Sequence, residues 1–401
     1  MIFDTERHLP IGQTTWSADA AEQALRDVLH GAIRDYSEET FWQTPAVAKD
    51  DPDVASTIYL GGMGVLWAID HLQNYIQVDL PFEKQALATR LYQRFVEKDV
   101  QALTMYSVDG KSCPSYFLGE TGMLLVMSKL QASSSAAHWD KLLPMIRQNM
   151  KNPTMEALWG GTGSIIPAVF KLQQEDSEAW REVFIEHCQF MKDTVSRDNS
   201  FNSPIWTQDL YGLKRTLLGA GHGFVGNLFP FIKGRQFLPK GLADWVLNDA
   251  VETMVRSAVV EGDCCNWPAE LVTLPDKSPK FLMQWCHGAP GVITSLNEIP
   301  VGYAQEFDAL LLKAGEGVWQ AGPLTKGVGI CHGTDGNGYA LLKLYTRTGD
   351  PKWLERARAF AMYAIEQNIN GHSLWEGDLG LACYLHACLK VDDRFPLLDV
   401  Y

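Results

Sequence analysis

The sequence lacks long apolar runs. Nothing in its 401 residues approaches the roughly 20 consecutive apolar residues that a membrane-spanning helix needs. The first residues, MIFDTERHLPIG, include acidic side chains where a secretory signal would have a basic start and an apolar core. Low-complexity stretches are absent as well. We therefore expect a soluble, folded protein of the cytoplasm.

Basic clusters are also missing. The chain has 34 Lys and Arg against 48 Asp and Glu, a formal net charge of -14, and nowhere are basic residues dense enough to follow a phosphate backbone. We therefore expect no nucleic-acid partner.

Cysteine is scarce, with eight in the chain. In a reducing compartment such cysteines are metal ligands, nucleophiles or core residues rather than disulfides.

The chain does contain a short repeated motif, in which two glycines three residues apart precede an apolar run. The motif occurs seven times, at Gly61 and Gly64, Gly119 and Gly122, Gly160 and Gly163, Gly223 and Gly226, Gly288 and Gly291, Gly333 and Gly336, and Gly377 and Gly380. A single such pair carries almost no information. Seven copies indicate stacked supersecondary units rather than independent domains.

Each unit is typical of a helical hairpin. The stretch DPKWLERARAFAMYAIEQ has one apolar stripe at helical spacing, with Asp350 as the expected cap and Pro351 at the first position. The runs that follow the glycines are apolar on nearly all sides, as in buried inner helices. Seven hairpins predict an all-α fold, an α/α toroid with a ring of inner helices inside a ring of outer ones. We expect residues 51–401 to form this single domain, and residues 1–50 to be an extension whose helix, Ala20 to Ile33, packs on it.

In such a ring, the glycines lie where the chain turns into each inner helix, at one end. Glycine permits positive φ and close backbone approach there. Side chains that flank the glycines then converge on one mouth. The residues that this arrangement brings together are Cys286, Cys331, His332, His222, Glu156 and Glu376.

Two motifs carry the same tripeptide, Cys286-His287-Gly288 and Cys331-His332-Gly333. Thiolate and imidazole ligands suit zinc, and three protein ligands leave a fourth position open for a reacting group. The tripeptides alone do not distinguish such a site from two buried cysteines. Cys286, Cys331 and His332 form one Cys-Cys-His set, but the symmetry of the tripeptides offers His287 equally well.

Three further residues near the glycines are site candidates. His222 occupies the slot of His287 and His332 in another motif, and histidine is a natural proton donor or acceptor near neutral pH. Glu376 either serves the site or complements a helix dipole. Trp285 is either a core aromatic or a platform for the substrate.

With these residues in view, the sequence resembles the lanthionine synthetase C-like (LanC-like) family. The likeness is sharpest in QWCHGAPGV, KGVGICHGTDGNGYALLKLY, SLWEGDLG and the terminal RFP, and WCHG looks like the eukaryotic-type branch. It implies a toroid whose zinc is held by Cys286, Cys331 and His332. It also implies His222 as the general acid/base, helped by His287. Two further matches are Glu156, where the family has an acidic residue, and Lys326, near bound glutathione or phosphate.

The resemblance further implies a reaction: a thiol adds to dehydroalanine or dehydrobutyrine and forms a lanthionine-type thioether. The thiol belongs to glutathione or a peptide cysteine, and phosphate elimination precedes addition where the peptide carries phospho-Ser/Thr. Expected partners are thus glutathione and dehydrated or phosphorylated peptides. Two alternatives remain: a non-catalytic scaffold or sensor that binds zinc and glutathione, and a toroid enzyme acting on carbohydrates. The carbohydrate-active enzyme is suggested by the 13 Trp residues, and its chemistry would need a pair of carboxylates at the mouth of the ring.

Overall fold

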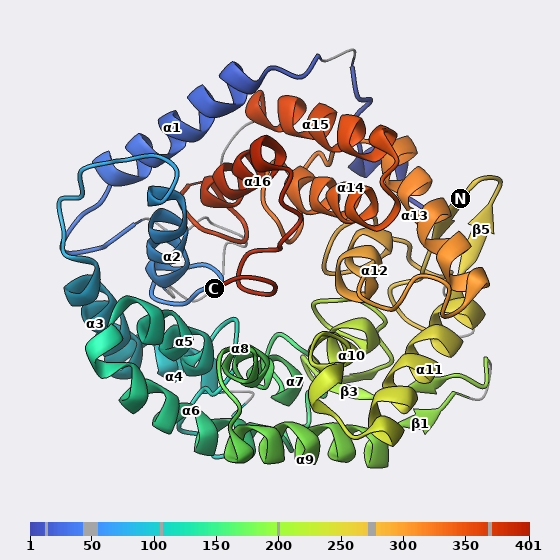
Figure 1. The fold of residues 1–401 in the computed structure, drawn as a ribbon, viewed down its shortest axis with the longest axis horizontal. Coiled ribbons are helices and arrows are strands. Elements are labelled where there is room, and N and C mark those ends of the chain that lie inside the picture. Colours follow the sequence, from blue (N-terminus) through green and yellow to red (C-terminus); the bar gives the residue numbers. More distant parts are fainter. Residues whose placement is uncertain (13–14, 43–54, 105–106, 199–200, 272–277, 368–370) are drawn as a thin grey trace.

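The computed structural model describes residues 1–12, 15–42, 55–104, 107–198, 201–271, 278–367 and 371–401, which wind into two concentric rings of helices (Figure 1). The outer ring consists of α1 (Ala18–Arg34), α3 (Lys84–Arg94), α6 (Ser135–Asn149), α9 (Glu178–Thr194), α11 (Lys240–Ser257), α13 (Gln305–Ala321) and α15 (Pro351–Ile365). The inner ring consists of α2 (Gly62–Gln73), α5 (Glu120–Leu130), α7 (Gly161–Ser164) with α8 (Ile166–Gln174), α10 (Phe224–Lys233), α12 (Ala289–Leu296), α14 (Thr334–Thr348) and α16 (Asp378–Lys390). The predicted α/α toroid is confirmed.

The outer helices form where the sequence has one apolar stripe. In α15, Asp350 accepts a hydrogen bond from the amide of Lys352, Pro351 opens the helix, and the stripe from Trp353 to Ala364 is buried. In α1, the side chain of Ser17 caps the helix in the same way. Helix α1 packs on α16 and lies in the outer ring. The proposed boundary near residue 50 falls within residues 43–54, outside the described residues, and stays a prediction.

Each inner helix begins directly after the first glycine of a motif. Gly61, Gly119, Gly160, Gly223, Gly288, Gly333 and Gly377 are the N-cap residues. Helices α2 and α16 are buried along nearly their whole length, as expected for the inner ring. The motif therefore marks the point at which the chain enters the core.

The glycines are required for close packing more than for unusual backbone angles. Gly288 alone among the seven N-caps has positive φ, at 105°, whereas the others are extended. The expectation of positive φ is thus wrong for six of them. A Cβ at Gly119 would collide with the carbonyl oxygen of Cys113, and one at Gly333 with that of Val328. Only glycine lets the turn fold back this tightly.

Backbone hydrogen bonds join neighbouring motifs around the ring. They link the residues that stand two positions before the first glycine: Tyr59 N to Phe117 O, Leu158 N to Gly221 O, Gly221 N to Cys286 O, Cys286 N to Cys331 O, and Cys331 N to Trp375 O. Their lengths run from 3.1 to 3.4 Å. The motifs therefore meet at one end of the ring, and equivalent residues of successive motifs become neighbours.

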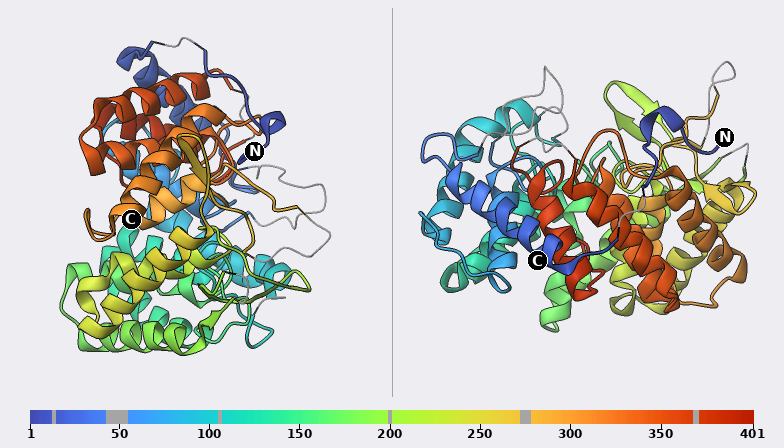
Figure 2. Two further views of the ribbon diagram at one scale, coloured as in Figure 1. Left: turned by 90° about the vertical axis from the view of Figure 1, so that its right-hand side faces the viewer. Right: turned by 90° about the horizontal axis from the view of Figure 1, so that it is seen from above.

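The connections carry small elements that the sequence did not predict. Three antiparallel hairpins pair β1 (Ser196–Arg197) with β2 (Pro204–Ile205), β3 (Gln208–Leu210) with β4 (Leu213–Arg215), and β5 (Val259–Glu261) with β6 (Cys264–Asn266). Short helical turns are η1 (Thr5–Arg7), η2 (Phe95–Asp99), α4 (Val100–Leu103), η4 (Ala132–Ser134) and η5 (Arg235–Phe237). Figure 2 shows the N-terminal residues and the strands on one side of the ring.

The chain ends inside the inner ring (Figure 1). Asp399 accepts hydrogen bonds from Lys233 and Lys343, both at 2.6 Å, and none of the three side chains is more than 9% exposed. Phe395 stacks on Trp285, with ring centroids 5.7 Å apart. The last residues thus fill the centre of the ring from within.

No described helix has the length and apolar character needed to cross a membrane.

Candidate metal centre

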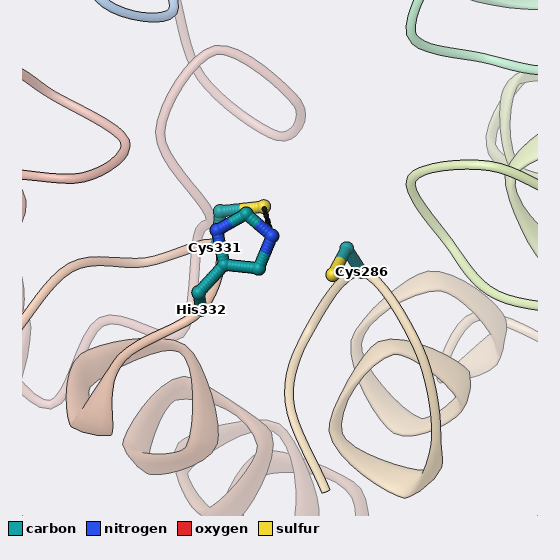
Figure 3. A group of neighbouring side chains, drawn as sticks. All are labelled: Cys286, Cys331 and His332. Atoms are coloured by element: carbon teal, nitrogen blue, oxygen red, sulfur yellow. Dashed lines mark hydrogen bonds between the residues drawn. The ribbon is translucent and has the colours of Figure 1, made fainter. Parts of the chain in front are cut away.

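Cys286 and Cys331 lie side by side because they occupy the same slot of two neighbouring motifs. The amide of Cys286 donates to the carbonyl of Cys331 at 3.4 Å. His332 follows Cys331 on the turn into α14, and its Nε2 lies 3.7 Å from the Cys331 sulfur. One ligand atom from each of the three residues lies within 4.8 Å of the others (Figure 3).

This donor set fits zinc. Zinc–sulfur and zinc–nitrogen bonds of about 2.3 and 2.0 Å place the ligand atoms of a tetrahedral site roughly 3.5 to 3.8 Å apart. The Cys331 sulfur and His332 Nε2 have this separation, at 3.7 Å, and all three ligand atoms lie within 4.8 Å of one another. Nδ1 of His332 faces Oε1 of Glu376 at 2.5 Å, and the hydroxyl of Tyr59 donates to the same oxygen at 2.7 Å. A carboxylate behind the far nitrogen is the usual support of a metal-binding histidine.

Charges around the two sulfurs favour Cys286 as a thiolate. Burial opposes its ionisation, but the hydrogen bond from Cys331 and the charge of His332 hold the pKa of Cys286 well below its usual range. Burial and the neighbouring Cys286 raise the pKa of Cys331. Burial lowers the pKa of His332, yet the negative charges of Cys286 and Glu376 outweigh it and raise this pKa to about 10. The site therefore attracts positive charge, as a cation site must.

His222 projects from the neighbouring motif and is held by Glu156. Nδ1 of His222 lies 2.9 Å from Oε2 of Glu156, which is fully buried. The carboxylate also accepts the amides of Leu158 and Trp159, so its position is fixed by its own turn. Burial lowers the pKa of His222, but the hydrogen bond that its Nδ1 donates to Glu156, together with the negative charge of that carboxylate, reverses this effect and raises the pKa. The other nitrogen, Nε2, has no hydrogen-bond partner among the described residues.

His287 stacks on His222, with ring centroids 5.8 Å apart and planes inclined by 25°. Its Nδ1 is buried without a partner in the described part of the chain, and burial lowers its pKa to about 4. It does not belong to the group of three candidate ligands. Of the two histidines offered by the tripeptides, His332 is thus the one that faces both sulfurs.

Two other candidates lie apart from this group. Trp285 is buried and packs on Trp375 and Phe395, so its ring lies in the inner core below the motifs. Lys326 is exposed on the connection that leads to Cys331. Within the ranges that the structure describes, no hydrogen bond or ion pair joins Lys326 to the other candidates. Their roles toward a substrate stay predictions.

Sequence reasoning missed Tyr59, although the repeat contained the signal. Tyr59 stands two positions before Gly61, the slot that Cys286 and Cys331 occupy in their motifs. Aligning the motifs would have placed it beside the site. Gln284, whose Nε2 donates to the Cys286 sulfur at 2.9 Å, was also missed. It stands four positions before Gly288, as Glu156 does before Gly160.

The chain is similar to known proteins in sequence and in fold. The family described as lanthionine synthetase C-like protein matches residues 52–400. A Danio rerio protein named glutathione S-transferase LANCL1 is 28% identical over 371 residues, which cover 86% of this chain and 85% of that protein. An Arabidopsis thaliana protein named LanC-like protein GCL1 is 39% identical over 133 residues, 30% of each.

Among solved structures, nisin cyclase superposes with a TM-score of 0.61 at 15% identity. The superposition covers 94% of this chain and 99% of that one. At this level of identity the likeness concerns the fold. The match extends around the whole ring.

Proposed function

The chain belongs to the lanthionine synthetase C-like family, and from this membership we propose that it is a zinc-dependent enzyme that adds a thiol to a dehydroamino acid in a peptide. The observation that carries the proposal is the convergence of Cys286, Cys331 and His332 within 4.8 Å at the mouth of the ring. Three ligands of this kind leave the fourth position of a tetrahedral site open.

Cys286, Cys331 and His332 would hold the zinc, and Glu376 would orient His332. Bound there, zinc lowers the pKa of a coordinating thiol, so that the thiol reacts as a thiolate near neutral pH. Tyr59 restrains Glu376 through its hydroxyl. The protein thus holds the metal-binding side chains in position before the substrate binds.

His222 would supply the proton that completes the addition. The sulfur forms a bond with Cβ, the π electrons of the Cα–Cβ double bond move onto the carbonyl as an enolate, and Cα then takes a proton. Overall, the S–H of the thiol adds across the double bond and nothing leaves. Glu156 occupies Nδ1 of His222, so Nε2 is the nitrogen that faces outward for this transfer. His287 packs against the imidazole and limits its rotation.

Glutathione is the thiol we favour, because the Danio rerio relative that matches most of the chain carries the name glutathione S-transferase. A peptide cysteine is the other candidate. Dehydrated peptides supply the acceptor, or phosphorylated peptides after loss of phosphate. Lys326, exposed and basic, would assist with a phosphate or a glutathione carboxylate. We place the reaction in the cytoplasm, where glutathione is abundant and thiols stay reduced.

The carbohydrate alternative has little support. It requires two carboxylates available at the mouth. Glu156 and Glu376 each bond a histidine instead.

The direct test incubates the zinc-loaded protein with glutathione and a panel of dehydroalanine peptides, and follows peptide mass. We expect an increase of one glutathione per dehydroalanine. Cys331→Ala should abolish it, whereas Cys383→Ala, which removes a buried thiol of α16 that is not one of the candidate ligands, should not. Zinc binding without any mass increase across the panel would leave only the non-catalytic scaffold.

A further inference from the structure

One position of the repeated motif has the same structural role in four of its copies. The residue four positions before the first glycine uses its side-chain oxygen to accept the backbone amide three residues later. Four motifs do this: Thr57 accepts from Leu60, Ser115 from Leu118, Glu156 from Trp159, and Ser373 from Glu376. The contact closes the turn that leads into the inner helix.

Gln284 occupies this slot before α12 but makes different contacts. Its backbone closes the turn, because its amide and carbonyl exchange hydrogen bonds with His287 at 3.2 Å. The side chain is thereby free, and it is buried. Its Nε2 donates to the sulfur of Cys286 at 2.9 Å, and its Oε1 accepts from the Arg7 guanidinium at 2.8 Å.

Chemistry fixes the orientation of this amide. An arginine only donates hydrogen bonds and a thiolate only accepts them. The oxygen of Gln284 must therefore face Arg7, and the nitrogen must face Cys286. The reverse orientation would lose both contacts, so the two contacts depend on each other.

The N-terminal segment, residues 1–9, holds Arg7 beside Gln284. The amide of Leu9 donates to Pro323 O at 2.8 Å, and the amide of Thr325 donates to Arg7 O at 3.0 Å. His8 bonds the carbonyl of Gly322 at 2.9 Å. The segment thus pairs with the connection between α13 and α14, on the side of the ring where the N-terminus lies (Figure 2).

We propose that Arg7 and Gln284 form a relay that positions a hydrogen bond on the Cys286 thiolate and thereby tunes its electron donation to the metal. The proposal rests on the metal site of the proposed function. Gln284 and Arg7 are positioning residues, since neither needs to touch a substrate. Among the described residues, no carboxylate forms an ion pair with Arg7, so its charge polarises the amide.

The relay offsets the negative charge that collects at the site. Two protein thiolates and a substrate thiolate together exceed the charge of one Zn²⁺. A hydrogen bond from an amide that a guanidinium polarises draws electron density from the Cys286 sulfur. When the Cys286 sulfur donates less electron density, the metal is better able to bind and deprotonate the incoming thiol.

Cobalt(II) in place of zinc reports this directly, because its charge-transfer absorption depends on the electron density of the thiolate ligands. We expect Gln284→Leu to shift the band to lower energy, and Arg7→Met to shift it the same way by less. Arg7→Lys, which keeps a charged donor, should restore part of the wild-type band. The double variant should match Gln284→Leu alone, since Arg7 acts only through Gln284.

Ser115→Ala serves as the matched control, because it removes the side chain of the equivalent slot in a motif without candidate ligands. It should leave the band unchanged. Arg7→Met changes no buried core residue and keeps the test valid if Gln284→Leu folds poorly. A cobalt-loaded Gln284→Leu with the wild-type band, or additive shifts in the double variant, would overturn the relay. Failure of the wild-type chain to bind cobalt or zinc would instead overturn the metal site, and the relay with it.

Discussion

Nδ1 of His332 lies 2.5 Å from Oε1 of Glu376, although the two residues are 44 positions apart. They meet because they stand directly before the first glycine in successive motifs. The carboxylate decides which imidazole nitrogen faces the sulfurs. The sequence alone did not decide whether Glu376 serves the site or complements a helix dipole. In the structure, Glu376 contacts a candidate ligand.

Glu376→Gln should weaken zinc binding by about 10- to 100-fold, because the amide keeps the shape but loses the charge that supports His332. Competition with a chromophoric chelator measures this affinity. Glu120→Gln is the matched control, since Glu120 also accepts a hydrogen bond from a tyrosine, Tyr92, but contacts no ligand. Equal affinities in the two variants would show that the contact with His332 is not a support.

Cys331→Ala should lower the zinc content from about one ion per chain to a small fraction of that, because two remaining ligands hold zinc poorly. Elemental analysis after dialysis measures the ratio. Cys383→Ala should keep the full content. If Cys331→Ala also keeps it, the ligand set must lie elsewhere.

Glu156→Gln should move the pH profile of the addition. A general acid must be protonated, so the rate falls as pH rises through its pKa. Glu156 raises the pKa of His222, and its loss should therefore shift this basic limb to lower pH. His222→Asn should lower the turnover rate by about 10²- to 10⁴-fold at pH values below the pKa of His222, where the wild-type imidazole is protonated. An unshifted limb in Glu156→Gln would exclude His222 as the acid.

His187 should make the protein sensitive to mild acid. It lies fully buried in α9 without a hydrogen-bond partner in the described residues, and burial lowers its pKa from 6.5 to about 3. The unfolded chain takes up a proton near pH 6.5 while the folded chain does not, so stability falls as pH drops from 6.5 toward 3. The slope is about 1.4 kcal/mol per pH unit.

Urea unfolding at several pH values measures this slope. His187→Leu should remove that contribution, and the same substitution at the exposed His30 controls for added apolar surface. An undiminished slope in His187→Leu would assign the acid sensitivity to other groups.

Asp399→Asn should destabilise the ring by about 1 to 3 kcal/mol. Lys233 and Lys343 would lose their shared counter-charge and keep only Glu298, at 3.0 Å, and Asp393, at 3.8 Å. Denaturant unfolding measures the loss. Asp244→Asn, which breaks the exposed pair with Lys240, should cost much less, because water screens the pair. Similar losses in both variants would mean that the buried cluster contributes no more than a surface pair.

The sequence by itself determined the ring. Paired glycines recur because the chain must turn tightly into each inner helix. All-round apolar runs recur because each inner helix is buried on every side. Both requirements act on residues that are close together in the sequence. The glycine spacing also placed Cys286, Cys331 and His332 at one end. Positive φ was the wrong local reason for most of the glycines. All seven N-cap glycines instead lie against backbone atoms across the turn, and this proximity depends on the folded loop.

Only the tertiary structure decided which side chains meet. The backbone hydrogen bonds between motifs set Cys286 against Cys331, Glu376 against His332, and Glu156 against His222. The relay from Arg7 through Gln284 joins residues 277 positions apart, and no local pattern encodes it. Local sequence fixes how each turn is built, whereas the contacts between turns depend on how the ring closes.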